Sequence, residues 1–566
     1  MSTSFLFLLL LSLQTSSLVA RIVLVHDSNW YPHAGNPGVK LRLTRKGAEH
    51  VKEVGVKLLN EQLAQLQGFK VQHAFQQPGL SGWIYVNDIR TLGYQPPERS
   101  RIEFAAPSFI TFAIENTAIS LTGRFLGVSG PFQVPGTVNG QMSGMSVALT
   151  TAFRATPDGT MAVNVVNCTT VILQSNFILS PEGPLSAILK TFEVQINDLI
   201  RQRIPNIFCR GLTDIIEKNS PALFQRLNRA QLTEHFQTFA GNGEGNRTLT
   251  SHIFIRRFTD GLYIDGHQIS SPIVTSEYFE TQQSGELRYN HTVGSAPFFP
   301  RPIPVDHSSE RMLYLYGSEF ALNSLLYHAY ESDRLSIRIE RDMLPEMYKG
   351  FVRTSCSDSS PMSASDGTEH EFLSSICVGK LIPNIAEKLP NTTTKFTLLA
   401  HGVPVTRFIE GFSPMDMKTR ILTYVDDHGQ ERQILVSSAD GVADIKLNAE
   451  DARITGDLKL RRLNVRLHRS AIGGISPESI EQLAPLAKTF LGPQLSRGLK
   501  QGLPFPLKAS RRGVNVLNAG VQDSITFIEP QLSIHDGFVR LATDFRLGEE
   551  NLRQKVREGF ERIKNS

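Results

Sequence analysis

The chain has 566 residues and a net charge of +4, with 40% hydrophobic and 20% charged residues. This ordinary globular composition excludes a wholly disordered, collagen-like or coiled-coil chain, and the length predicts two or more domains. The charge balance is too even to imply nucleic acid as an obligatory partner.

Residues 1–20 have the pattern of a secretory signal peptide. An apolar run, 5–11, is followed by small residues at 15–17 and 20, as is typical of such peptides. Cleavage after Ser17 or after Ala20 fits equally well. The run is too short to cross a bilayer, so we expect a secreted, extracellular protein.

The cysteines and sequons fit that compartment. An even count of four cysteines favours two disulfides in an oxidising environment, with free buried thiols as the alternative. The nearest neighbours in sequence would pair Cys168 with Cys209 and Cys356 with Cys377. Four Asn-x-Ser/Thr sequons are candidate glycosylation sites: Asn167, Asn246, Asn290 and Asn391. The sequence has no CxxC motif, so we predict no metal site.

The first half begins with a predicted helix, 45–67, whose apolar residues recur at helical spacing. Alternating strand-like segments follow, the clearest at 110–115. A second long helix is expected to begin at Pro184 and to end at or before Pro205, which would place Cys209 just beyond it. Further strands are expected near 253–258 and 285–289.

The second half repeats this order of elements. Four prolines within 297–305 predict a stiff extended connector and a domain boundary. A strand at 312–316 and a helix at 319–330 follow it. Later come alternating strands around 463–468, a helix after Ser476, and closing strands between 514 and 547. Two structurally related domains are therefore predicted.

The C-terminal tail is predicted to be an amphipathic helix. Leu552, Val556, Phe560 and Ile563 fall on one helical face. Such a tail can dock on lipid or plug an apolar opening, or it can pack against the second domain. The sequence alone favours the packing.

Four segments in order resemble one known family. They are 36–47 (NPGVKLRLTRKG), the proline-rich connector with Arg311–Leu315, the motif 502–507 (GLPFPL), and the spacing of Cys168 and Cys209. Together they resemble the bactericidal/permeability-increasing protein, lipopolysaccharide-binding protein, and cholesteryl ester and phospholipid transfer protein family. The resemblance covers nearly the whole chain beyond the signal segment.

The resemblance implies an α+β fold shaped as a two-domain boomerang. Each domain would be a twisted antiparallel β-barrel wrapped around a long helix, with a central antiparallel sheet joining the two. The expected divisions are a signal peptide (1–20), an N-terminal lipid-binding barrel domain (21–296), a proline-rich linker (297–309), a C-terminal lipid-binding barrel domain (310–548) and an amphipathic tail (549–566).

The resemblance also implies an apolar pocket for lipid acyl chains in each barrel. By themselves the apolar helix faces favour ordinary core packing. With the resemblance, they become candidates for the pocket lining: Val51, Leu58, Leu59, Leu185, Ile188, Leu189, Phe192, Ile196, Leu322, Leu325, Leu326, Ile480, Leu483, Ala487 and Phe490. Moving an acyl chain from a bilayer to such a pocket is nearly balanced in free energy and needs no catalytic group.

The segment 123–132 corresponds to the tip at which endotoxin binders of the family carry clustered lysines. It holds one cation, Arg124, among large apolar residues that include Phe125 and Leu126. Phosphate capture needs several charges or donors together, so these three residues are predicted to contact a membrane or lipoprotein surface. A strand pair with its apolar residues facing inward is the alternative.

The expected function is that of a secreted, monomeric lipid-binding protein that holds phospholipid-type acyl chains and transfers lipid between membranes or lipoproteins. Recognition of lipopolysaccharide or bacterial surfaces in innate immunity is the alternative. A secreted lipid hydrolase is an alternative of another class, but the sequence contains no GxSxG, HExxH or P-loop motif. We therefore predict no catalytic residue and no cofactor.

Overall fold

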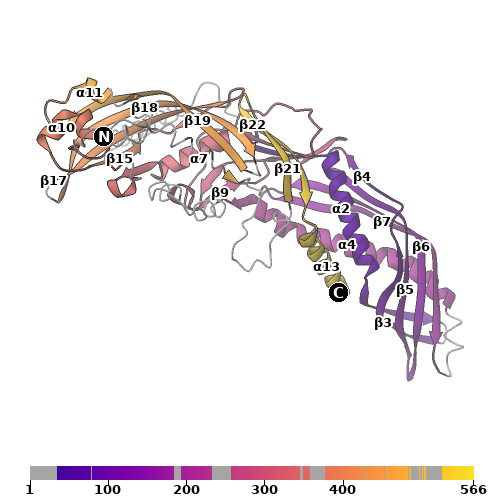
Figure 1. Ribbon diagram of the computed structural model, residues 1–566. Coiled ribbons are helices and arrows are strands. Elements are labelled where there is room, and N and C mark those ends of the chain that lie inside the picture. The colour runs from indigo at the N-terminus through magenta and orange to yellow at the C-terminus, as the bar shows by residue number, and fades with distance from the viewer. Residues whose placement is uncertain are drawn as a thin grey trace, which may run out of the picture.

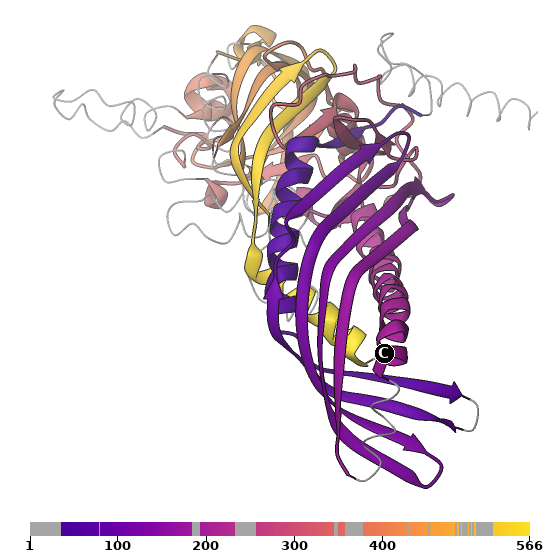
Figure 2. The same ribbon diagram turned by 90° about the vertical axis from the view of Figure 1, so that its right-hand side faces the viewer.

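The computed structural model describes residues 35–77, 80–183, 193–232, 256–344, 349–356, 377–427, 429–450, 453–481, isolated positions between 484 and 504, and 525–565. The expected signal peptide lies outside these residues. In the described part of the chain, no helix is long and apolar enough to cross a membrane. Two elongated lobes meet at an angle (Figures 1 and 2), which confirms the expected α+β boomerang.

The N-terminal lobe is built on one curved antiparallel sheet. Its strand order is β2-β3-β5-β6-β7, and β4 pairs with β5. The strands are β2 (Gln67–Gln77), β3 (Leu80–Gln95), β4 (Arg99–Ala105), β5 (Phe109–Ser129), β6 (Phe132–Ala155) and β7 (Met161–Pro181). Buried and exposed residues alternate along much of β5 and β6, because successive side chains of a strand point to opposite faces.

Two long helices accompany this sheet (Figure 2). The first, α2 (Arg45–Ala64), begins where Thr44 accepts a hydrogen bond from the backbone N–H of Gly47, as a good N-cap residue does. The second, α4 (Glu193–Asn228), continues through Pro205 and Pro221. The expectation that it ends by Pro205 was therefore wrong, and Cys209 lies inside the helix.

Helix α4 lies along the edge strand β7 and runs antiparallel to it. The Asn197 amide donates to the carbonyl of Phe177 at 2.8 Å and accepts from its N–H at 2.6 Å. Farther along, Cys209 forms a disulfide with Cys168, with their Cα atoms 5.6 Å apart. Near its end, Asn228 donates to the Thr160 hydroxyl at 2.7 Å. Covering a strand edge in this way protects it from pairing with another chain.

The central sheet interleaves distant parts of the chain in the order β10-β11-β1-β13-β22-β21. Its strands are β1 (Val39–Thr44), β10 (Ile273–Val274), β11 (Tyr278–Gln283), β13 (Leu313–Ser318), β21 (Ile525–His535) and β22 (Phe538–Leu547). Strand β1 pairs with β11 on one side and with β13 on the other. A three-stranded sheet, β12-β9-β8, lies apart from it and consists of β8 (Arg229–Gln231), β9 (Leu262–Asp265) and β12 (Leu287–Tyr289).

The C-terminal lobe holds a seven-stranded sheet in the order β14-β15-β17-β18-β19-β20, with β16 paired to β17. The strands are β14 (Ser336–Ile339), β15 (Thr394–Ala400), β16 (Val405–Thr406), β17 (Ser413–Asp427), β18 (Gln430–Glu450), β19 (Arg453–Ser470) and β20 (Leu503–Pro504). The helices in this half are α7 (Glu319–Glu331), a 3-10 turn η1 (Arg341–Met343), α9 (Val378–Leu381), α10 (Pro383–Lys388) and α11 (Pro477–Glu481).

One further local expectation was wrong. The segment expected as a strand at 253–258 is described only from residue 256, where 256–259 are helical. The tail forms helix α13 (Glu549–Asn565). Its Leu552 and Val556 lie in an apolar cluster with Leu58 of α2 and with Phe545 of β22, and Figure 2 shows α13 beside the N-terminal lobe.

Candidate functional site

The far end of the N-terminal lobe carries apolar residues on both faces of its sheet. Along β5, Arg124 and Leu126 alternate with Phe125, so they occupy opposite faces. Phe125 is 3% exposed and belongs to an inner cluster with Met142, Phe177 and other apolar residues. The expectation that Phe125 contacts a membrane is therefore not met, because its side chain faces the interior, as in the alternative of an inward-facing strand pair.

The opposite face presents Trp83, Tyr85, Leu126 and Val128. Phe132 pairs with Ser129, so it lies on the side of Phe125, at the exposed end of the sheet. We call these five residues the tip surface: Trp83, Tyr85, Leu126, Val128 and Phe132. Register places Leu126 opposite Tyr85 and Val128 opposite Trp83. The Trp83 and Tyr85 rings stack with centroids 6.4 Å apart. Trp83 is 45% exposed and Phe132, beside the β5–β6 turn, is 57% exposed. Arg124 is exposed on the same face as Leu126 and lies opposite Asn87.

The sequence analysis included Val128 and Phe132 within the apolar segment 123–132 but missed Trp83 and Tyr85 as surface candidates. Period-two alternation of 124–128 was the available signal, because it puts Arg124, Leu126 and Val128 on one face and Phe125 on the other. The pairing of β3 with β5, which brings Trp83 beside Val128, depends on register and could not be read from one strand alone.

The pocket candidates of the first helix do not share one environment. Leu58 is 2% exposed, Leu59 is half-buried, and Val51 is 40% exposed. Leu58 packs against the C-terminal helix and the central sheet, in the cluster that contains Phe545 and Leu552. The structure thus brings Leu58, but not Val51, into an apolar interior. Four candidates of the second helix and the side chain of a fifth lie outside the described residues: Leu185, Ile188, Leu189, Phe192 and Ile196.

The candidates of the second half are packed against protein where they are described. Leu325 and Leu326 are each 8% exposed, and Leu322 and Leu325 pack with Tyr289 and Ala329. Ile480 is 1% exposed in a cluster with residues of α9, α10, β17 and β18. Leu483, Ala487 and Phe490 lie outside the described residues.

Both disulfides have the nearest-neighbour pairing expected from the sequence. Cys356 is bonded to Cys377, with Cα atoms 5.7 Å apart. Of the sequon asparagines, Asn167, Asn290 and Asn391 are exposed, and Asn246 lies outside the described residues. Over the described ranges, no group of three or more His, Cys, Asp or Glu side chains is arranged to hold a metal ion.

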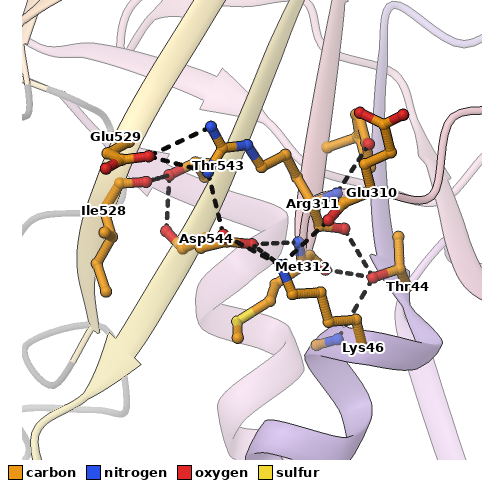
Figure 3. Close-up of polar contacts among 11 residues, drawn as sticks. Thr44, Lys46, Glu310, Arg311, Met312, Ile528, Glu529, Thr543 and Asp544 are labelled. Carbon is orange, nitrogen blue, oxygen red and sulfur yellow. Dashed lines mark hydrogen bonds and ion pairs between the residues drawn. The ribbon is translucent and has the colours of Figure 1, made fainter.

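A polar network fixes the junction of the two halves (Figure 3). The Asp544 carboxylate on β22 accepts hydrogen bonds from the Met312 N–H at 2.9 Å, from Arg311 at 3.1 Å and from Lys46 at 3.2 Å. Burial alone would raise the pKa of Asp544, but these hydrogen bonds outweigh it and hold that pKa below its usual value. Asp544 thus joins β22 to the start of β13 and to the first turn of α2.

A second, buried network ties the proline-rich connector to the central sheet. Arg42 on β1 donates to the Glu280 carboxylate at 2.6 and 2.8 Å, and its side chain is 2% exposed. It also bonds to the carbonyl of Asp306, while Lys40 donates to the carbonyl of Ile303 at 3.2 Å. The connector is therefore bound along β1 and is not a free spacer.

Comparison with known proteins identifies the family of the chain. The model of the LBP / BPI / CETP family, C-terminal domain, matches residues 258–547. A bactericidal permeability-increasing protein of Sebastes schlegelii is 20% identical and covers 85% of this chain and 92% of the relative. A lipopolysaccharide-binding protein of Bos taurus is 21% identical and covers 90% of this chain and 94% of the relative. A crystal structure of lipopolysaccharide binding protein aligns with 91% of this chain and 100% of that chain at 16% identity and a TM-score of 0.46. Because the family model spans half of its length, the chain belongs to the LBP/BPI/CETP family.

Proposed function

We propose that this protein is a secreted lipid-binding protein that attaches to lipid surfaces through the tip surface and shelters acyl chains inside its N-terminal lobe. The observation that carries the proposal is the apolar character of both faces of the β3–β5 pair at the distal end. An antiparallel sheet of an ordinary soluble domain has one apolar and one polar face. The inner face carries an apolar cluster, and the exposed tip surface calls for an apolar partner.

The chemistry of the tip surface suits the boundary between lipid and water. Tryptophan and tyrosine combine an apolar ring with one polar group and favour this boundary. Phe132 is the first residue of β6, directly after Gly130 and Pro131, and its side chain is exposed at this end of the sheet. Because the tip surface itself is uncharged, attachment would depend mainly on apolar area and only weakly on salt.

The proposal is tested by flotation of the protein with phosphatidylcholine vesicles. Partial burial of two large apolar side chains contributes about 2 kcal/mol, so W83A/F132A is expected to bind about ten- to thirtyfold more weakly. The matched control is I273A/V305A, which removes two exposed apolar side chains from the central region, 40% and 68% exposed. Equal binding by wild type and W83A/F132A would exclude the tip surface as the attachment site.

Lipid carried inside the lobe needs a separate measurement. Protein purified from its own secretory pathway would be extracted, and its lipids would be counted by mass spectrometry. Acyl lipid in a fixed ratio to protein is expected. Lipid-free protein of full thermal stability would argue against an internal site, whatever the vesicle result, and transfer between vesicles by the loaded protein would establish the carrier role.

Lipopolysaccharide is the second candidate ligand, because several relatives are named for binding it. Arg124 lies on the same face as Leu126 and Trp83 of the tip surface and is exposed, so it can meet an anionic headgroup. If lipid A phosphates are recognised there, R124Q should weaken binding to lipopolysaccharide more than binding to phosphatidylcholine, and added salt should reproduce the effect. Equal losses for the two lipids would favour general lipid binding.

A further inference from the structure

A cavity of about 420 Å³ lies in the C-terminal lobe, at the end of the sheet nearest β16. Its apolar lining consists of Ile409, Pro414 and Val442. The volume falls within the range of small-molecule sites. The cavity belongs to neither the tip surface nor the inner cluster, because all of its lining residues come from 407–462.

The cavity lies on the face of the sheet opposite the core. Ala443, the neighbour of Val442 on β18, is fully buried in a cluster with Leu458 and Leu460. Since successive residues of a strand point to opposite faces, Val442 faces away from that cluster and toward the cavity. The cavity is therefore not continuous with the apolar interior of the lobe.

Two consecutive arginines enter the cavity because β19 is irregular there. Val442 pairs with Arg462 and Ala443 pairs with Leu460, so Arg461 is an extra residue in the ladder. In a regular strand Arg461 and Arg462 would point to opposite faces. A β-bulge re-aims side chains, and both arginines line the same cavity. Bulges of this kind are over-represented next to functional sites.

Positive charge exceeds negative charge around the cavity. Arg407 joins the two arginines, and Asp416 is the one carboxylate among the lining residues. Arg461 lies 3.5 Å from the Asp444 carboxylate, and its side chain is 56% exposed, so part of its guanidinium is open to a ligand. In the described part of the chain, the Arg462 guanidinium makes no hydrogen bond or ion pair. It is available to a ligand.

We propose that this cavity binds a phosphate group, with Arg461 and Arg462 as the principal donors and Arg407 as a further cation in the lining. Planar guanidinium groups bind phosphate oxygens through paired hydrogen bonds. The apolar wall would accept the carbon portion of the same ligand. A soluble phosphate ester and the headgroup of an anionic lipid share this chemistry, and the site is independent of the function proposed for the tip surface.

The test compares R461Q/R462Q with R466Q/R469Q. The control removes two exposed arginines from the same strand, outside the cavity lining. Calorimetry with glycerol 3-phosphate measures the affinity for a soluble phosphate ester. Flotation tests for binding of a lipid headgroup. Its readout is the gain in affinity when phosphatidic acid is added to phosphatidylcholine vesicles. Thermal unfolding of both variants checks that they are folded, as expected for exposed side chains.

We expect R461Q/R462Q to lose about tenfold or more in affinity for the phosphate probe, the scale of a lost charge-assisted hydrogen bond. The control should retain wild-type affinity. Loss in the calorimetric arm identifies a soluble ester, and loss in the vesicle arm alone identifies a lipid headgroup. The proposal is overturned if wild type responds to neither probe, or if both variants lose affinity equally.

Discussion

Removing the charge of Asp544 should loosen the junction between the two halves. In D544N, the remaining side-chain oxygen can still accept the Met312 N–H, but the attraction to Arg311 and Lys46 is lost. Lys46 is 48% exposed and Arg311 is 21% exposed. Solvent therefore limits the Lys46 contribution to a few tenths of a kcal/mol. With about 1 kcal/mol for the better-shielded Arg311, the total loss is about 1–2 kcal/mol.

Hydrogen exchange measures this loss directly on β13 and β22. A change of this size should accelerate exchange of their amides about five- to thirtyfold at neutral pH. The matched control is E529Q, which removes the other partner of Arg311. Because Glu529 is 75% exposed, that variant should change exchange very little.

The pH dependence gives a second test of the same reasoning. The folded-state pKa of Asp544 is lowered, so its stabilisation is fully present above the unfolded-state value of about 3.9. It is lost as the pH falls below about 4 and through the folded-state value. Urea unfolding followed by circular dichroism should therefore give D544N a lower free energy of unfolding than wild type at pH 7. At strongly acidic pH the two free energies should be equal. An equal deficit at both pH values would refute the electrostatic account.

Two further substitutions test other contacts. Arg42→Met leaves the buried Glu280 carboxylate with only Lys40, 3.8 Å away, as an ion-pair partner. It should lower the free energy of unfolding by about 3 kcal/mol. Adding Glu280→Gln should restore much of this loss, and a loss below about 1 kcal/mol in urea titration would contradict the reasoning. Arg553→Glu places like charge against Glu61, which Arg553 now contacts at 2.7 Å. It should weaken the contact of α13 with α2, seen as faster proteolysis of the tail, whereas Arg557→Glu on the same helix should leave cleavage unchanged.

The sequence predicted the elements that depend on local pattern. The strand and helix after the connector fall within two residues of β13 and α7, because alternation and helical spacing are read over short windows. The expectation that a helix ends before an internal proline failed for α4. Tertiary contacts along β7, including the disulfide of Cys209 and the Asn197 bonds, accompany a helix that local propensity would have ended at Pro205.

Long-range pairing could not be predicted in the same way. The amphipathic face of the tail was visible, but not its contact with α2, since an apolar stripe does not specify its partner. The orientation of Phe125 depended on which face of β5 is interior. The extra residue Arg461 became visible only through the register of β19 against β18.

The interleaved central sheet sets a limit on how this protein can be divided. A fragment ending before residue 297 would keep β11 beside β1 but would lose β13 from its other side. Backbone groups of Val39–Leu43 would then form an open edge able to recruit a strand from another molecule. The strand that follows the connector is thus needed to complete the pairing of β1 in the central sheet.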